Sequence, residues 1–189
     1  MYSLLKKHKY TVGHVGKLGL NVKLNRKLNF DFYNEYEGWH WKRIGDRLWH
    51  ITEKNTADAL RFLEEKPKDK PFFLNVAYYA THAVDNDVRQ YRPQRASMTM
   101  YRNDTIPEPE DTYDKMPYFF TKQNEGRNRW RWRFDTHDKH QRMMKNYYRM
   151  ASEVDSSVGI IIDQLQKSGE LNNTMIMHSV FAQSSFGLI

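Results

Sequence analysis

The chain has 189 residues, a formal net charge of +7 and no cysteine. This length suits one domain, and the basic charge favours anionic partners such as nucleic acid, acidic polysaccharide or sulfate esters. The lack of cysteine excludes disulfides, thiolate metal sites and a cysteine nucleophile in the chain as written. No apolar run reaches the ~20 residues of a transmembrane helix, and residues 1–17 lack a signal-peptide pattern. We therefore expect no membrane partner, and the sequence leaves the compartment open.

The N-terminal residues predict a helix end followed by a short strand. Residues 1–9 resemble the tail of an amphipathic helix, and residues 10–17, YTVGHVGK, are typical of a strand that ends at Gly16 and Lys17. A cation that follows a strand is well placed to bind an anion, although an ordinary solvated lysine produces the same pattern. Lys17 is therefore our first candidate for an anion-binding residue.

Two connections and a helix follow. Residues 18–29 are a polar, basic connection, and residues 30–41, FDFYNEYEGWHW, predict an aromatic loop that either packs against the body or lines a substrate site. Residues 52–65 predict an amphipathic helix, with Thr52 or Asn55 as its N-cap.

An apolar run over residues 72–80, FFLNVAYYA, organises the rest of the chain. It is rich in β-formers and lacks polar alternation, so it predicts a central strand buried on both faces of a parallel sheet. The run stops just before His82, and ligands of open α/β sheets bind outside the carboxyl ends of the strands. His82 is therefore our second candidate site residue, and a loop histidine bonded to backbone is the alternative.

Residues 85–120 have no sustained period and predict a long excursion over the carboxyl edge of the sheet. The alternating segment 126–134, GRNRWRWRF, would place four arginines on one face of an extended chain. These are Arg127, Arg129, Arg131 and Arg133. Such a face suits nucleic acid or sulfated glycans, whereas the alternative is an edge segment whose arginines pair with the acidic run 108–114.

The C-terminal part predicts one more helix and one more strand. Residues 138–167 have apolar side chains at three- and four-residue spacing, which predicts the longest helix. Residues 173–180, NTMIMHSV, predict a second buried, central strand. The whole pattern predicts an α/β fold, a three-layer sandwich with a mostly parallel central sheet.

Four stretches that follow one another along the chain carry a family resemblance. They are residues 10–17 (YTVGHVGK), 66–82 (KPKDKPFFLNVAYYATH), 146–159 (NYYRMASEVDSSVG) and 167–177 (KSGELNNTMIM). In this order they resemble the sulfatase family of the alkaline-phosphatase-like fold. The resemblance implies an incomplete, internal piece of a domain that hydrolyses sulfate esters.

The resemblance also implies roles for both candidate residues. In that family a formylglycine made from cysteine attacks sulfur, a calcium ion binds the sulfate, and lysine and histidine side chains contact the sulfate oxygens. Lys17 matches the lysine of the family's Gly-Lys pair, and His82 matches the histidine after the central strand. Both are therefore expected to be catalytic and substrate-binding residues.

The chain departs from the family's pattern at positions that carry the chemistry. The family's Cys-x-Pro-x-Arg segment is absent, and Leu18 and Gly19 stand where the family commonly has Trp-His. The later metal-binding positions fall on Phe181, Ala182 and Gln183. None of these binds calcium as a carboxylate would. We therefore expect Ca²⁺ in the intact family but no ligands for it here, with the resemblance ending near residue 177 and a divergent tail over residues 178–189.

These observations predict a sulfatase-domain protein that is truncated or inactive. Its expected partner is a sulfate ester or a sulfated polysaccharide. The alternative is a non-catalytic binding protein for sulfated or otherwise anionic polysaccharide on the same scaffold. Nucleic acid is not an expected partner, because the basic residues are spread along the chain and no nucleic-acid-binding motif is present.

Overall fold

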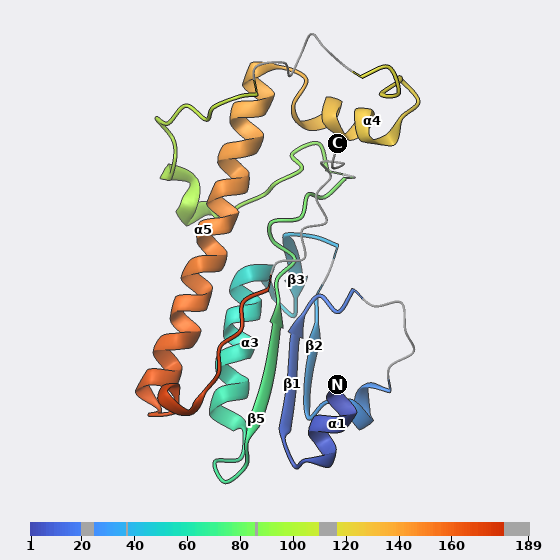
Figure 1. The fold of residues 1–189 in the computed structure, drawn as a ribbon. Helices are drawn as coiled ribbons and strands as arrows, with labels where there is room; N and C mark the ends of the chain where they lie inside the picture. Colours follow the sequence, from blue (N-terminus) through green and yellow to red (C-terminus); the bar gives the residue numbers. More distant parts are fainter. Residues whose placement is uncertain (20–24, 37, 86, 110–116, 180–189) are drawn as a thin grey trace.

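A parallel sheet forms the centre of the protein. The computed structural model describes residues 1–19, 25–36, 38–85, 87–109 and 117–179. The sheet has the order β2-β1-β5, formed by Phe32–Glu35, Thr11–Gly16 and Phe72–Ala77 (Figure 1). All three strands are parallel, and β1, in the middle, is buried at every residue.

Helices cover both faces of this sheet. Successive side chains of a strand point to opposite faces. Phe72 of β5 packs against Phe62 of α3 (Ile51–Glu65), with ring centroids 6.1 Å apart. Its neighbour Phe73 packs at 6.0 Å against Tyr2 of α1 (Tyr2–Lys7) on the other face. The predicted α/β sandwich is therefore confirmed, with the sheet as its middle layer.

The close approach of α3 to β1 depends on Gly13. A Cβ atom at this position would lie 2.7 Å from the ring of Phe62 and 2.9 Å from the side chain of Leu74. Ala59, Phe62 and Leu63 are buried on the same stripe of the helix, as the sequence pattern predicted.

The long helix α5 (His137–Lys167) lies outside α3 and joins two parts of the core. Near its start, Met143 and Met150 form a cluster with Ala83 and Tyr91. Near its end, Leu165 packs with Phe62 and Leu63 of α3.

The remaining elements are short. They are α2 (Arg26–Asn29), the antiparallel pair β3 (Trp41–Ile44) and β4 (Arg47–His50), η1 (Arg95–Thr99), α4 (Glu125–Arg133) and η2 (Leu171–Asn173). Within the described residues, no helix has the length and apolar character needed to span a bilayer.

Both strand predictions that placed apolar runs in the sheet centre need correction. The strand predicted over residues 72–80 ends at Ala77, is half-buried, and pairs only with β1 within the described sheet. Residues 174–179 form no strand, and Met175, Ile176 and Met177 are 85%, 49% and 81% exposed; Val180 lies outside the described residues. An apolar run supplies strand-forming side chains, but burial also requires neighbouring strands, and among the described residues neither run has one on each side.

Three local predictions also differ from the structure. The segment 126–134 is helical, because Asn124 caps α4 by accepting the N–H of Arg127, and arginine is a good helix former. The predicted aromatic loop 30–41 contains strand β2. Thr52 and Asn55 lie inside α3, whose N-cap is His50 without a side-chain capping bond.

Candidate functional site

Lys17 and His82 both follow strands that end at the same edge of the sheet. Gly16 pairs with Ala77 at the carboxyl ends of β1 and β5, and the N–H of Lys17 donates to the carbonyl of Ala77 at 2.8 Å. Gly16 has a φ of +100°, and a Cβ there would lie 1.9 Å from that carbonyl oxygen. Only glycine fits this turn, which places Lys17 at the carboxyl edge.

Tyr79 brings the two candidate side chains together. The Lys17 ammonium lies 5.6 Å from the centroid of the Tyr79 ring, within cation–π range. The His82 ring packs against the same tyrosine, with centroids 5.3 Å apart. The structure therefore gathers both residues around one largely buried aromatic ring. Sequence reasoning placed Tyr79 inside a strand and missed this contact.

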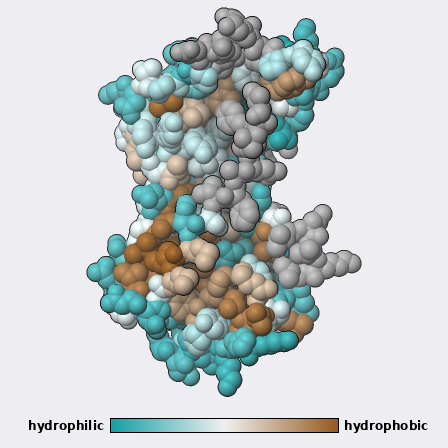
Figure 2. Space-filling view, viewed as in Figure 1, coloured by the Kyte–Doolittle hydropathy of each residue, from teal (hydrophilic) through white to brown (hydrophobic). Residues whose placement is uncertain are grey.

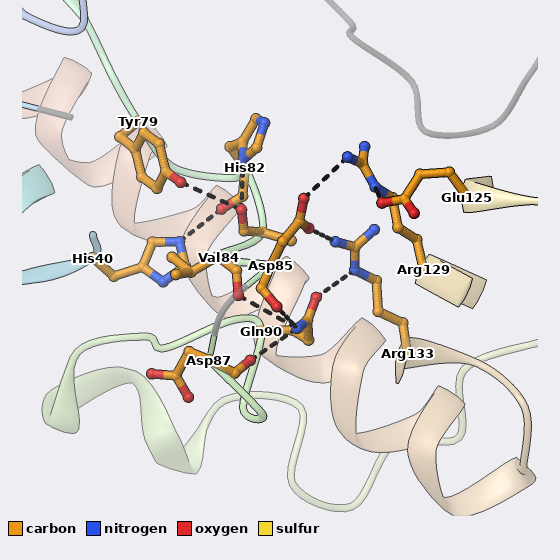
Figure 3. A network of polar contacts seen from close by, with 11 residues as sticks. His40, Tyr79, His82, Val84, Asp85, Asp87, Gln90, Glu125, Arg129 and Arg133 are labelled. Atoms are coloured by element: carbon orange, nitrogen blue, oxygen red, sulfur yellow. Dashed lines mark hydrogen bonds and ion pairs between the residues drawn. The ribbon is translucent and has the colours of Figure 1, made fainter. Parts of the chain in front are cut away.

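The hydrogen bond of His82 fixes which of its ring nitrogens faces outward. Nδ1 lies 2.6 Å from the carbonyl oxygen of Ala83. A carbonyl only accepts, so Nδ1 carries a hydrogen and donates it. Nε2 is left to exchange a proton or to bind a ligand, and it points away from the surrounding polar network (Figure 3). The His82 side chain is exposed, as a ligand-binding residue requires.

A second histidine, His40, holds the backbone at His82. Its buried Nε2 donates to the carbonyl of His82 at 2.7 Å (Figure 3). Its Nδ1 accepts the N–H of Arg92 at 3.3 Å. Burial lowers the pKa of His40 to about 4, so the ring is neutral at pH 7. Only a neutral ring makes both bonds, because one nitrogen must donate and the other must accept.

His50 supports the far end of the same loop. Its Nε2 lies 3.1 Å from the carbonyl of Arg92, and burial lowers its pKa to about 4 as well. His40 and His50 thus fix both ends of the loop 82–92. Neither histidine stood out in the sequence, since the roles of both depend on a loop about 40 residues away along the chain.

Three of the four arginines predicted to share a face bond to other groups of the same chain. Arg133 donates through Nε to Gln90 at 2.7 Å and through Nη2 to Asp85. Arg129 lies 3.3 Å from the other oxygen of Asp85, and Arg127 donates to the carbonyl of Phe120 at 2.8 Å. The side chain of Arg131 is exposed.

The predicted face of four arginines on an extended segment is therefore wrong, because the segment is helical. A helix distributes residues spaced by two around its axis, so the four arginines do not share a face. The acidic partner of Arg129 and Arg133 is Asp85, and most of the predicted acidic run, residues 110–114, lies outside the described residues.

The described side chains do not fit a calcium ion. They contain no group of three or more His, Cys, Asp or Glu residues that could hold a metal. Asp85 is paired with two arginines, and Arg89 holds the pKa of Asp87 at about 2 through a side-chain hydrogen bond. Calcium takes six to eight oxygen ligands. The positions 181–183 lie outside the described residues.

Comparisons with known proteins identify the fold and the family of the chain. The solved structure of BT4656 in complex with its substrate D-glucosamine-2-N,6-O-disulfate is similar, with a TM-score of 0.64 and 19% sequence identity. The match covers 91% of this chain and 47% of that chain, so this chain spans about half the length of its neighbour. No curated protein sequence matches the chain. The family model for sulfatases matches residues 1–179, nearly the whole sequence. The chain therefore belongs to the sulfatase family.

Proposed function

We propose that this chain is the sulfate-binding part of a sulfatase domain, in which Lys17 and His82 contact the sulfate group of a sulfate ester. One observation carries the proposal: both side chains pack against Tyr79 at the carboxyl edge of two parallel strands. Ligands of open α/β sheets bind at this edge. A lysine and a histidine are also the donors that an anionic group requires.

The two residues would act differently on the ester. The Lys17 ammonium stabilises negative charge on the sulfate oxygens. With Nδ1 donating to Ala83, Nε2 of His82 carries a hydrogen only when the ring is an imidazolium. In that form Nε2 donates to the ester oxygen, and in a domain that also supplies a nucleophile it would give this proton to the departing oxygen. Because Nδ1 is already bonded to Ala83, the ring keeps Nε2 directed outward throughout.

The chain does not supply the rest of the family's chemistry. It has no cysteine and so cannot form a formylglycine nucleophile. The calcium ion of the intact family would need ligands that the described residues do not provide. We infer that the chain binds sulfate esters without turning them over. BT4656 binds a sulfated glucosamine, which makes a sulfated sugar the first natural ester to try.

A surface for sulfated polysaccharide built from the α4 arginines has less support. Arg127, Arg129 and Arg133 are already bonded to groups of the same chain, and only Arg129 of these three is substantially exposed, at 40% of its side chain.

The proposal is tested with 4-nitrocatechol sulfate, which reports both binding and hydrolysis. We expect saturable binding by calorimetry and no release of 4-nitrocatechol, with or without calcium. Lys17→Met and His82→Asn should each weaken binding ~10–100-fold, because a hydrogen bond to a charged group contributes ~1.5–3 kcal/mol.

Two surface variants serve as matched controls. Lys7→Met and His8→Asn remove the same groups from exposed positions just before β1, at the edge of the sheet opposite to Lys17, and they should leave the affinity unchanged. Equal weakening by the controls would show that binding is only bulk electrostatics. Hydrolysis by the unmodified chain would require a different nucleophile.

A further inference from the structure

The loop that carries His82 is built around one buried glutamine. Residues 82–92 contain no helix or strand among the positions that the structure describes. The side-chain amide of Gln90 donates to the carbonyls of Val84 and Asp85, both at 3.3 Å, and of Asp87 at 2.8 Å. The backbone N–H of Val84 donates to the carbonyl of Gln90 at 2.9 Å. Gln90 therefore uses its donors inside the loop, and its side-chain oxygen faces outward.

Arg133 takes up that oxygen from outside the loop. It is the last residue of α4 and only 3% exposed. Its Nε donates to Oε1 of Gln90 at 2.7 Å, and its Nη2 bonds to Oδ1 of Asp85 (Figure 3). One guanidinium thus ties two residues of the loop to the end of a helix. The guanidinium does this with donors on two nitrogens in a fixed plane, a geometry that the single nitrogen of a lysine ammonium does not reproduce.

Asp85, which Arg133 holds, lies only three residues after His82 in the same loop. On the other side, His40 holds the carbonyl of His82 at 2.7 Å, and the hydroxyl of Tyr79 donates to the carbonyl of Ala83 at 3.3 Å. His82 therefore lies between two sets of bonds, one from His40 and Tyr79 and one from Arg133 through Asp85 (Figure 3). Its own bond, from Nδ1 to Ala83, depends on the backbone that these bonds hold.

We propose that Arg133 is a positioning residue for His82, which acts through Asp85 and Gln90 and does not contact the sulfate ester. The inference rests on the proposed role of His82 in sulfate binding. It also explains what α4 contributes, because this helix fixes the loop 82–92 from the side opposite to His40.

The matched pair Arg133→Met and Arg131→Met separates positioning from charge. Both variants remove one arginine from α4, but Arg131 is exposed and Arg133 is buried in the loop contacts. We expect Arg133→Met to speed amide hydrogen exchange at Val84 and Gln90 by about tenfold, while Val12 and Val15 of β1 stay protected. The ring signals of His82 in NMR spectra should shift or broaden in this variant only.

Binding of 4-nitrocatechol sulfate gives the functional readout. If the loop holds His82 correctly for only about a tenth of the time, the apparent affinity falls about tenfold. Arg131→Met should bind as the unmodified chain does. Arg133→Lys keeps the charge but replaces two donor nitrogens in a fixed plane by one, so it should not restore the affinity.

Other outcomes would show whether Arg133 acts by position or only by charge. Equal weakening by Arg131→Met, or rescue by Arg133→Lys, would mean that charge alone matters and would overturn the proposal. Faster exchange in β1 as well would mean a general structural role and would also overturn it. If Arg133→Met does not fold, Asp85→Asn weakens the contact between Arg133 and Asp85 instead, and hydrogen exchange and the His82 ring signals are measured in that variant. If the unmodified chain binds no sulfate ester, the proposed function fails, yet hydrogen exchange and the His82 signals still decide whether Arg133 positions the loop.

Discussion

Two buried imidazoles make the loop at His82 sensitive to protons. His40 and His50 are each 1% exposed, and burial lowers the pKa of both to about 4. In the unfolded chain each would titrate near 6.5. Between these two pH values the unfolded state binds more protons than the folded state. The stability they contribute is therefore present above pH 6.5 and is lost as the pH falls towards 4.

His40 is the better residue for testing this. Glu153 lies 3.7 Å from His50, and burial raises the pKa of Glu153, which contributes with the opposite sign at low pH. We expect the chain to lose about 2 kcal/mol for each imidazole between pH 7 and pH 5. In His40→Asn the loss should be smaller by that amount, as measured by urea unfolding at both pH values. If His40→Asn and the unmodified chain lose the same free energy of unfolding between pH 7 and pH 5, the His40 ring is not held neutral.

At the level of elements, a methyl group added at two glycines should have opposite effects on stability. Gly13 of β1 lies against Phe62, whereas Gly159 of α5 has no atom within 4 Å of an added Cβ. Gly13→Ala should destabilise the fold by about 1–3 kcal/mol through overpacking between α3 and the sheet. Gly159→Ala should stabilise it by about 0.5–1 kcal/mol, because glycine is a poor residue for a helix interior. The midpoints of urea unfolding measure both. A neutral Gly13→Ala would mean that α3 moves away from β1 without cost.

The elements that the sequence predicted well are those with strong local patterns. α5 and α3 show clear helical periodicity, and Lys17 and His82 follow strands that are next to each other in the sheet. Helix α4 was missed because alternating Arg and Trp residues imitate a strand, while its Asn124 cap is a single residue. The supports of His82 were missed for another reason. The contact of His40 with His82 spans 42 residues and that of Arg133 with Asp85 spans 48, and no local pattern encodes such pairs.

On the scale of the whole molecule, α5 connects the site loop to the sheet. Its 31 residues extend over about 46 Å at 1.5 Å per residue. One end packs with Ala83 and Tyr91 of the site loop, and the other end packs with α3 beneath the sheet. Figure 2 shows hydrophobic side chains gathered on the face where residues 174–179 cross the helices. Within the described part of the chain, this segment is the largest departure from the expected sheet.

The exposure of residues 174–179 also predicts which methionines are oxidised first. Met175 and Met177 are 85% and 81% exposed, whereas Met143 and Met150 are fully buried on α5. Oxidation to methionine sulfoxide needs access to the sulfur, so mild peroxide should modify the first pair and spare the second until the chain unfolds. Peptide mass spectrometry would read both pairs in one sample. Protection of Met175 and Met177 in the folded chain would instead mean that this segment is covered in solution, and early modification of Met143 would mean that the core around the site loop is open.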